Sequence, residues 1–532
     1  MAPAVLDMRD RDGLFTALGE RTFDLAVIGG GITGAGVARD AALRGLSVAL
    51  VEAGDFASGT SSRSSKMIHG GLRYLAQGDL ALVREAASER KIVQAIAPHL
   101  AIETPFVIGA RGAAGVARLR AGLWTFEKLG GVPKSRAHEL WSAAELARRE
   151  PAMNSEGLVG AVVYPEYLTN DARLTLANVL SASAAGAIVV NYAAAEGFVI
   201  EDGRAVGIEV ADRSPGGESR HTRLSAKIIV NAAGPWVDAV RALESADAPA
   251  RLALSRGVHL VVRHERAPAQ RTWIVPAGGG RSIFVVPKGG ATYIGTTDTF
   301  FHEPETWPPV RAEDADYLLA AANARLNGPP LTQADIVAAW SGLRPLVGEP
   351  GKGASEISRR DEVWTGPAGV ISVAGGKLTA YRRMAQRVVD KVQHALGRKP
   401  TACHTALEHL PGGEIAPETI LADLERQGLD AAGAMRLVGL YGSGATALTG
   451  GSAAEAAHAV ASEGALTLED YWVRRAARAW FDADGGMAAL GPAAWAMAPL
   501  LGWSEMRIAE EIAACHARRE ADLAMPAGAP SA

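Results

Sequence analysis

The chain has 532 residues, of which 48% are hydrophobic and 21% charged, and its formal net charge is -4. This length exceeds that of one ordinary domain, so we expect two or three domains around a large core, and the balance of charges argues against nucleic-acid binding. Cys403 and Cys515 are the only cysteines and lie far apart, which argues against disulfides and against a metal site and favours a reducing compartment.

Two uncharged stretches are long enough to be considered as membrane spans. Residues 174–195 contain polar breaks that divide them into a helix and a strand, and residues 485–504 contain two prolines. Residues 1–20 lack the apolar core of a secretory signal. We therefore expect any membrane contact to be peripheral.

A glycine-rich turn follows the first clear strand. Residues 23–28 are apolar and predict a buried strand, and the alanine-rich residues to Arg44 predict a helix. Between them stand Gly29, Gly31 and Gly34, whose spacing allows a tight turn, close approach of a pyrophosphate and close helix packing. The helix N-terminus would then point at that pyrophosphate.

An acidic residue ends the second predicted strand, residues 46–51. Glu52 lies about twenty residues beyond the glycines, where a carboxylate can accept hydrogen bonds from both ribose hydroxyls of an adenosine. The pattern predicts dinucleotide binding and disfavours a 2′-phosphate. A tight turn in an unrelated α/β unit is the alternative, and the glycines alone do not distinguish FAD from NAD.

A polar segment comes next. Residues 57–66 are rich in serine, and residues 67–75 contain His69, two glycines, Arg73 and Tyr74. Such a segment suits a loop that lines a polar cofactor, although a solvated serine loop is the plainer interpretation.

Two amphipathic helices are predicted in the following region, over about residues 84–97 and 116–129. The second carries Trp124 and Phe126 beside basic residues. Its apolar side could face either the protein core or a membrane interface.

The centre of the chain is rich in strands. Residues 188–190, 197–201 and 205–210 predict strands, and residues 227–230 predict a buried strand that returns to the nucleotide-binding sheet. Residues 252–262, 282–287 and 292–295 alternate without long helices, which indicates an antiparallel sheet.

The end of the chain changes character. A strand at residues 370–373, Gly375-Gly376-Lys377 and a helix from Thr379 to about Leu396 form a second strand-glycine-helix unit. After residues 411–413 only helical periodicity remains, which predicts a small all-α domain.

Several motifs resemble the FAD-dependent (respiratory, quinone-linked) glycerol-3-phosphate dehydrogenase family along nearly the whole chain. They are residues 60–66, 69–74, 171–174, 231–236, 257–259, 295–298, 342–345 and 375–382. The resemblance implies an α/β fold with a Rossmann-like FAD-binding domain of the glutathione-reductase/D-amino-acid-oxidase type, an antiparallel-sheet substrate domain and a C-terminal all-α domain.

The expected domain boundaries follow from this reading. Residues 20–402 form the oxidoreductase region, with a discontinuous FAD-binding part at about 20–100, 175–250 and 335–402. The substrate part covers about 101–174 and 251–334. Residues 403–532 form the C-terminal helical domain.

The resemblance also assigns residues to FAD. They are Gly29, Gly31, Ile32, Gly34, Glu52, Thr60, Ser61, Ser62, Ser65, Lys66, His69, Gly70, Ala233, Gly234, Trp236, Gly376, Lys377, Leu378 and Thr379. It points to Arg73, Tyr74, Arg359 and Lys377 as a cradle for a substrate phosphate, with Arg360 as an alternative to Arg359. Cations in such a cradle suit a dianionic ester.

His259 is the candidate base that takes the proton of the substrate hydroxyl, and Arg344 is the candidate group that polarises the developing oxyanion. A core histidine bonded to the backbone is the alternative for His259. Two departures from the family pattern are Glu166 and Asn170, to which we assign no catalysis, and Arg256, which stands where relatives often carry lysine.

The implied reaction is the oxidation of sn-glycerol 3-phosphate to dihydroxyacetone phosphate by hydride transfer to the flavin. Electrons would pass to ubiquinone or menaquinone, which implies a cytoplasmic enzyme held peripherally at the inner face of the cell membrane; a homodimer is compatible with it. The alternatives are a glycerol-3-phosphate oxidase that uses O2, another D-amino-acid-oxidase-like flavoenzyme, and a flavin-binding scaffold without activity.

Overall fold

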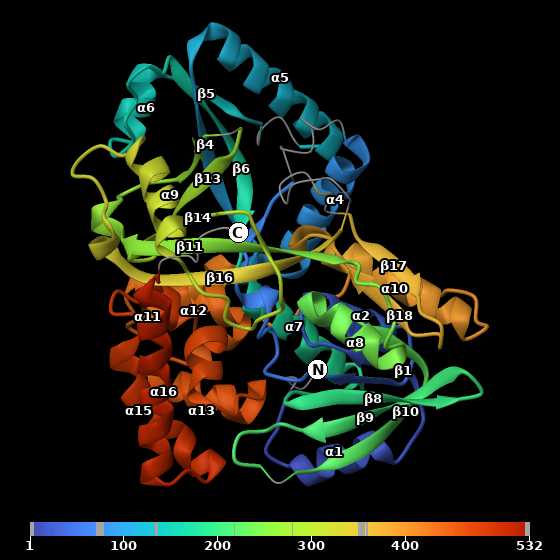
Figure 1. The fold of residues 1–532 in the computed structure, drawn as a ribbon. Coiled ribbons are helices and arrows are strands. Elements are labelled where there is room, and N and C mark those ends of the chain that lie inside the picture. Colours follow the sequence, from blue (N-terminus) through green and yellow to red (C-terminus); the bar gives the residue numbers. More distant parts are fainter. Residues whose placement is uncertain are drawn as a thin grey trace.

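The computed structural model describes residues 5–70, 79–132, 137–217, 219–278, 280–348, 357 and 360–526. Three of the predicted phosphate-binding residues, Arg73, Tyr74 and Arg359, lie outside the described residues. Figure 1 shows two sheets stacked along the molecule and a block of C-terminal helices beside them.

The first sheet has a parallel core. Its strands run in the order β17-β18-β10-β1-β2-β7. They are β17 (Glu362–Thr365), β18 (Ile371–Ala374), β10 (His221–Asn231), β1 (Phe23–Ile28), β2 (Val48–Val51) and β7 (Ile188–Val190). All pairs are parallel except β17 with β18. The predicted return of residues 227–230 to this sheet is confirmed, because β10 pairs with β1.

A hairpin extends this sheet. It consists of β8 (Ala193–Glu201) and β9 (Arg204–Asp212), and β9 pairs with β10. Asp202 and Gly203 form its turn with φ of 48° and 74°, the left-handed values that a two-residue hairpin turn requires.

Helices cover the first sheet. α2 (Ile32–Leu43) packs against α7 (Asp171–Ala184) and α10 (Tyr381–Ala395), while α1 (Arg11–Gly19) and α8 (Val237–Glu244) contact other parts of the sheet. The alanines and glycines of α2 allow close packing: a Cβ on Gly36 would lie 3.2 Å from both Tyr381 and Ala385.

The second sheet is mostly antiparallel, as predicted. Its main path runs β15-β11-β14-β13-β12-β4-β6-β3, with β16 paired to β11 and β5 to β6. The strands are β15 (Thr299–Phe301), β11 (Leu252–Arg263), β14 (Ala291–Gly295), β13 (Ser282–Lys288), β12 (Thr272–Pro276), β4 (Ile102–Ala110), β6 (Gly160–Leu168), β3 (Met67–Ile68), β16 (Ile336–Val347) and β5 (Glu139–Ser142).

Two strands of the second sheet fall in segments expected to belong to the FAD-binding part. β3 lies within residues 20–100, yet it pairs with β6. Residues 336–347 fall in a segment predicted to belong to the FAD-binding part, yet β16 pairs with β11 along almost its whole length. Sequence alone does not reveal this, because a buried strand reads the same in either sheet. The division into domains otherwise stays a prediction.

Among the described residues, the helices that accompany the second sheet include α4 (Leu80–Ile96), α5 (Gly112–Gly130), α6 (Ala143–Arg149) and α9 (Ala312–Asn323). On α5, Leu123 and Phe126 are buried in the core, whereas Trp124 is 58% exposed. The helix therefore has both a core-facing side and an aromatic residue directed to solvent.

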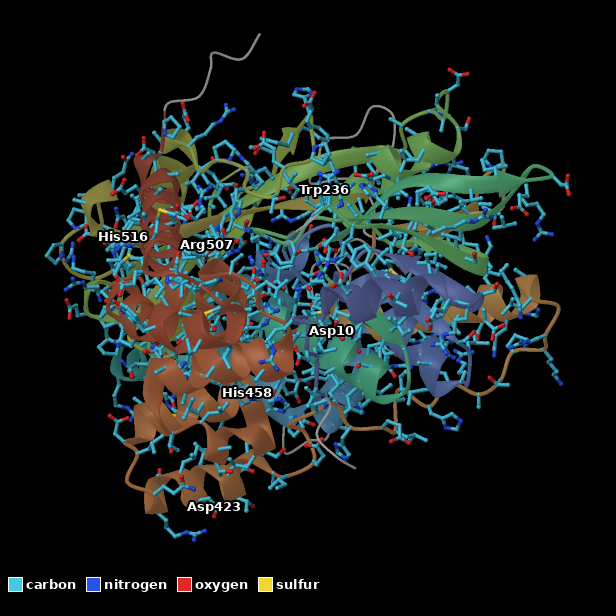
Figure 2. The ribbon with its side chains drawn as sticks, turned by 90° about the horizontal axis from the view of Figure 1, so that it is seen from below. Asp10, Trp236, Asp423, His458, Arg507 and His516 are labelled. Atoms are coloured by element: carbon cyan, nitrogen blue, oxygen red, sulfur yellow. The ribbon has the colours of Figure 1, made fainter. Side chains whose placement is uncertain are left out.

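The C-terminal part is helical, as predicted. It contains α11 (Pro417–Arg426), α12 (Ala431–Tyr441), α13 (Gly451–Glu463), a π-helix (Asp470–Arg475), α14 (Arg478–Phe481), α15 (Met487–Leu501) and α16 (Glu505–Ala524). In Figure 2, Asp423 marks the outer end of this block and His458 lies on α13. Trp340 of β16 and Trp472 belong to one hydrophobic cluster, so the helices pack directly on the second sheet. No described helix is long and apolar enough to cross a membrane.

Candidate active site

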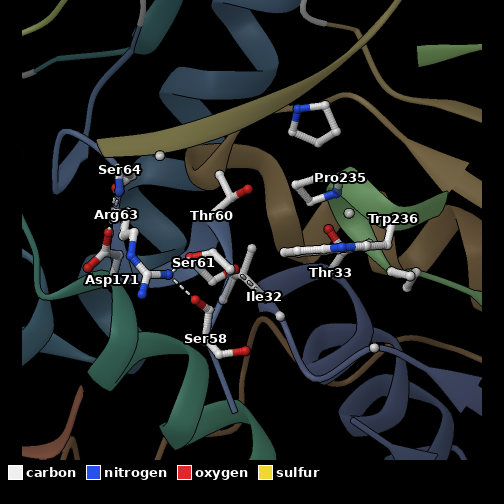
Figure 3. Close-up of a pocket in the computed structure, with 18 of the residues that line it drawn as sticks. Ile32, Thr33, Ser58, Thr60, Ser61, Arg63, Ser64, Asp171, Pro235 and Trp236 are labelled. Atoms are coloured by element: carbon white, nitrogen blue, oxygen red, sulfur yellow. Dashed lines mark hydrogen bonds between the residues drawn. The ribbon is translucent and has the colours of Figure 1, made fainter. Parts of the chain in front are cut away.

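A cavity of about 780 Å³ lies where the two sheets and the C-terminal helices meet. Its volume falls in the range of cofactor and ligand sites. Figure 3 shows Trp236 and Pro235 beside Ile32, Thr33, Thr60 and Ser61, all of which line the cavity.

The glycine turn forms one end of the cavity. Gly29 has φ of 110°, which disfavours a side chain, and a Cβ on Gly34 would collide with the carbonyl oxygen of Gly29. Gly29, Gly31 and Ile32 line the cavity, whereas Gly34 lies behind it and serves the packing of α2 on β1. The N–H of Ile32 donates to Ser61 Oγ at 2.9 Å, which joins the helix start to the serine loop.

Glu52 lines the cavity beside this turn. Its carboxylate accepts hydrogen bonds from the N–H groups of Gly30 at 2.7 Å and Gly54 at 2.8 Å. Burial raises its pKa despite these two bonds. A carboxylate has about four acceptor positions, so two remain for ribose hydroxyls. An acceptor at this place and a glycine turn without side chains fit the adenosine and pyrophosphate of a dinucleotide.

At the other end, two strands of the second sheet form the wall. β11 and β16 pair so that Ser255 opposes Arg344, Gly257 opposes Gly342, and His259 opposes Trp340. Because side chains alternate along a strand, these residues share one face. The motifs at residues 257–259 and 342–345 are therefore parts of a single surface, on which His259 and Arg344 both line the cavity.

His259 is held by its surroundings. Its Nε2 lies 2.9 Å from Ser65 Oγ, and its ring stacks on Trp340 with centroids 4.8 Å apart. Burial, followed by the charges of Arg344 and Lys66, holds the pKa of His259 well below its ordinary value. The imidazole is thus neutral at neutral pH, the protonation state that a general base needs, although the lowered pKa makes it a weaker base than a free imidazole.

Arg344 is oriented by oxygen atoms. Its guanidinium contacts Asp298 Oδ1 at 3.2 Å, Ser255 Oγ at 3.3 Å and Thr296 Oγ1 at 3.1 Å. A Cβ on Gly257 would collide with the guanidinium, which explains why glycine precedes Val258-His259 in the strand. The motif at residues 295–298 supplies two of these three partners, Thr296 and Asp298.

Lys66, which we expected at the cofactor, is not among the described residues that line the cavity. Its side chain is 2% exposed, and its Nζ donates to Asp171 Oδ1 and to the carbonyl of Ser62, both at 2.7 Å. Asp171 also accepts from the N–H of Ser64 at 2.9 Å. This buried pair shapes the turn that carries Ser65.

Two more of the predicted cofactor residues lie outside the cavity lining. Ser62 is buried, and its Oγ contacts the carbonyl of Gly59. Gly70 donates its N–H to Glu166 at 3.1 Å, and Glu166 also forms an ion pair with Arg90 at 2.7 Å. Glu166 thus joins the backbone at Gly70 to Arg90 of α4.

The remaining predicted residues do line the cavity. They are Thr60, Ser61, Ser65, His69, Ala233, Gly234, Trp236, Gly376, Lys377, Leu378 and Thr379. Thr379 Oγ1 donates to the carbonyl of His69 at 3.1 Å and joins the two segments. Arg360, the alternative to Arg359, instead pairs with Asp79 at 2.8 Å on an exposed surface.

Sequence reasoning missed several residues of the site. Trp340 precedes Gly342 by two positions, so strand alternation could have placed it on the same face as Arg344. Asp171 stood in a recognised motif without an assigned role. Glu469 and Arg474 line the cavity from the C-terminal part, and no local pattern indicates this.

Comparisons with known proteins show which families the chain matches. Residues 24–382 match the family described as FAD dependent oxidoreductase, and residues 450–508 match the family described as C-terminal domain of alpha-glycerophosphate oxidase. The aerobic glycerol-3-phosphate dehydrogenase of Bacillus subtilis (strain 168) is 39% identical over 505 residues, covering 89% of this chain and 90% of the relative.

A second relative and a solved structure extend the comparison. The aerobic glycerol-3-phosphate dehydrogenase of Staphylococcus aureus (strain USA300) is 41% identical over 437 residues, covering 79% of this chain and 78% of the relative. The X-ray structure of the glycerol-3-phosphate dehydrogenase from Bacillus halodurans complexed with FAD matches with a TM-score of 0.81 and 32% identity, covering 98% of this chain and 99% of that one.

Proposed function

Because the chain belongs to the family of FAD-dependent glycerol-3-phosphate dehydrogenases, within the larger family of FAD dependent oxidoreductases, we propose that it oxidises sn-glycerol 3-phosphate to dihydroxyacetone phosphate. The observation that carries the proposal is that a neutral histidine and an arginine share one wall of the cofactor cavity. Electrons then pass to a membrane quinone.

His259 takes the proton of the substrate hydroxyl. It is neutral because its pKa is lowered by burial and by Arg344 and Lys66. Ser65 Oγ and the ring of Trp340 fix the orientation of the imidazole. A positioned base contributes about 10²–10⁴-fold to the rate, so His259→Gln should lower kcat by that factor. His264→Gln, in the turn just after the same strand, should not.

Arg344 stabilises the negative charge that develops on the substrate oxygen as the proton leaves. Its partners Asp298, Thr296 and Ser255 hold the guanidinium before substrate arrives, so little reorganisation is needed. FAD, when bound by the residues that line the rest of the cavity, supplies the acceptor for the hydride.

The phosphate of the substrate is held by cations. Lys377 lines the cavity at the turn before α10, and we propose that Arg73, Tyr74 and Arg359 complete the cradle. These residues would form charge-assisted hydrogen bonds with the dianionic phosphate ester. We therefore propose a phosphorylated polyol, and not an amino acid, as the substrate. Lys377→Met should raise KM for the phosphate ester far more than it raises KM for any uncharged alcohol that reacts.

The test of the substrate is anaerobic bleaching of the visible flavin band. Addition of sn-glycerol 3-phosphate should bleach it rapidly, whereas glycerol and D-alanine should not. Bleaching by D-alanine would favour an amino-acid oxidase, and absence of bleaching by any of the three would refute the substrate assignment.

A glycerol-3-phosphate oxidase is the second candidate. It is favoured by the match of residues 450–508 to the C-terminal domain of alpha-glycerophosphate oxidase. The two candidates differ in which compound restores the flavin colour after bleaching. Rapid restoration by a soluble quinone analogue and slow restoration by O2 is the result expected for a dehydrogenase, and the reverse would establish the oxidase.

We propose peripheral membrane contact through the outer side of α5. Trp124 is exposed there, and a shallow groove lined by Val116, Arg120 and Trp124 follows the helix. An aromatic residue beside basic ones suits a membrane interface. Trp124→Ser should weaken co-sedimentation with anionic lipid vesicles, and unchanged co-sedimentation would place the contact elsewhere.

A further inference from the structure

The C-terminal domain reaches the cofactor cavity. Glu469 and Arg474, just before and within the π-helix Asp470–Arg475, are among the residues that line it. Both lie beyond residues 24–382, which match the FAD dependent oxidoreductase family. We infer that the C-terminal domain forms part of the FAD site, and that Asp55, Arg474 and Arg475 are positioning residues that couple FAD binding to the docking of this domain.

Asp55 is a buried point of attachment between the glycine-turn region and the C-terminal domain. It lies three residues after Glu52, and it is 2% exposed. Its carboxylate accepts hydrogen bonds from Nε of Arg474 and from both terminal nitrogens of Arg475, at 2.5 and 2.8 Å. The bond to Arg475 is bidentate, the geometry in which arginine and carboxylate interact most strongly.

The attachment continues to Glu52 through a short loop. Gly54 donates its N–H to Glu52 at 2.8 Å, and its carbonyl accepts from the N–H of Tyr192 at 2.8 Å. Asn191 Nδ2 lies 3.1 Å from Asp55 and 2.9 Å from the carbonyl of Gly464. If the C-terminal domain is displaced, residues 53–55 lose these contacts. They then no longer fix the carboxylate of Glu52, which is predicted to bind the ribose.

The charges at this contact stabilise one another. The arginines lower the pKa of Asp55, and Asp55 raises the pKa values of Arg474 and Arg475 against the cost of burial. Arg474 also bonds Glu469 at 2.9 Å, at the cavity wall. Asp55 and the two arginines thus link the FAD site to the contact with the C-terminal domain. Because such coupling is reciprocal, bound FAD should stabilise the docked domain by the same free energy by which docking strengthens FAD binding.

The test compares FAD affinity in two variants that each neutralise a buried carboxylate paired with two arginines. Asp55→Asn removes the charge at the contact between domains. Glu455→Gln is the control, because Glu455 is equally buried but bonds Arg436 and Arg478 within the C-terminal domain. The dissociation constant of FAD, measured by flavin fluorescence on stripped and refilled protein, should rise about tenfold or more in Asp55→Asn, as is typical of coupled sites. It should stay within about twofold of wild type in Glu455→Gln.

Amide hydrogen exchange of the full-length wild-type protein gives a second readout that needs no variant. No residue of α13 (Gly451–Glu463) lines the cavity, yet FAD should slow exchange there if binding and docking are coupled. Exchange in α13 that is identical with and without FAD would overturn the inference, as would an unchanged FAD affinity in Asp55→Asn. Both readouts depend on FAD binding and not on the substrate, so they remain decisive even if sn-glycerol 3-phosphate fails to bleach the flavin.

Discussion

Neutralising Asp171 should destabilise the protein strongly, because it would leave a buried lysine without its counter-charge. The Asp171 and Lys66 side chains are 0% and 2% exposed, and Lys66 Nζ lies 2.7 Å from Asp171 Oδ1. In Asp171→Asn the ammonium keeps the carbonyl of Ser62 as an acceptor but loses the carboxylate. Burial already lowers the pKa of Lys66 while Asp171 opposes the shift.

Breaking one side of a buried ion pair costs about 3–5 kcal/mol. At about 2 °C per kcal/mol, the lower end for large domains, the melting temperature should fall by about 6–10 °C. The double variant Lys66→Met/Asp171→Leu replaces both charges with apolar groups and should lose less than either single change, because no uncompensated charge remains.

Thermal unfolding of the FAD-loaded protein, followed by circular dichroism, measures Asp171→Asn, the single variants Lys66→Met and Asp171→Leu, and the double variant. The control is Glu196→Gln, which breaks an exposed pair with Arg213 and should cost at most about 1 kcal/mol. The reasoning would be refuted if the fall in melting temperature of the double variant equalled the sum of the falls of its two single variants. A melting temperature of Asp171→Asn as high as that of the control would also refute it.

Three further predictions concern glycines and a buried histidine. Gly34→Ala should yield protein with little bound FAD by flavin absorbance, because the new Cβ meets the backbone of Gly29, whereas Gly115→Ala, with open space around it, should bind FAD normally. Gly257→Ala should displace the Arg344 guanidinium and lower kcat by about 10²–10³-fold with FAD retained; normal turnover would contradict the assigned place of Arg344. Burial and Arg173 lower the pKa of His99 to about 3, so the unfolded chain binds a proton that the folded one does not, and stability should fall by about 1.4 kcal/mol per pH unit as pH decreases from about 6.5 toward 3. The melting temperature of His99→Gln should therefore vary less with pH over that range than that of wild type.

Much of the first sheet could be predicted from the sequence. The strand at residues 23–28, the glycine turn and the helix that follows obey local rules, since an all-apolar run favours a buried parallel strand and glycines permit φ values that other residues avoid. The hairpin turn at Asp202-Gly203 was predictable for the same reason. Each of these features depends on residues close together in the chain.

The place of Lys66 could not be predicted in this way. Lys66 is one of several polar side chains in residues 60–66, a segment expected to lie beside a cofactor. The neighbouring residues in the sequence do not indicate that its side chain pairs with Asp171. The sequence also did not show that β16 belongs to the second sheet. A strand pattern indicates which residues are buried, but not which strand pairs with it.

The sequence by itself determined a dinucleotide-binding α/β unit, an antiparallel sheet and a helical C-terminal part, because periodicity, glycine spacing and the acid after the second strand are properties of short segments. The tertiary structure alone decided that His259 and Arg344 share a wall, since this depends on the register between β11 and β16. It alone decided that Arg474 reaches the cavity and Asp55, since these residues are 419 positions apart and meet only when separate domains pack together.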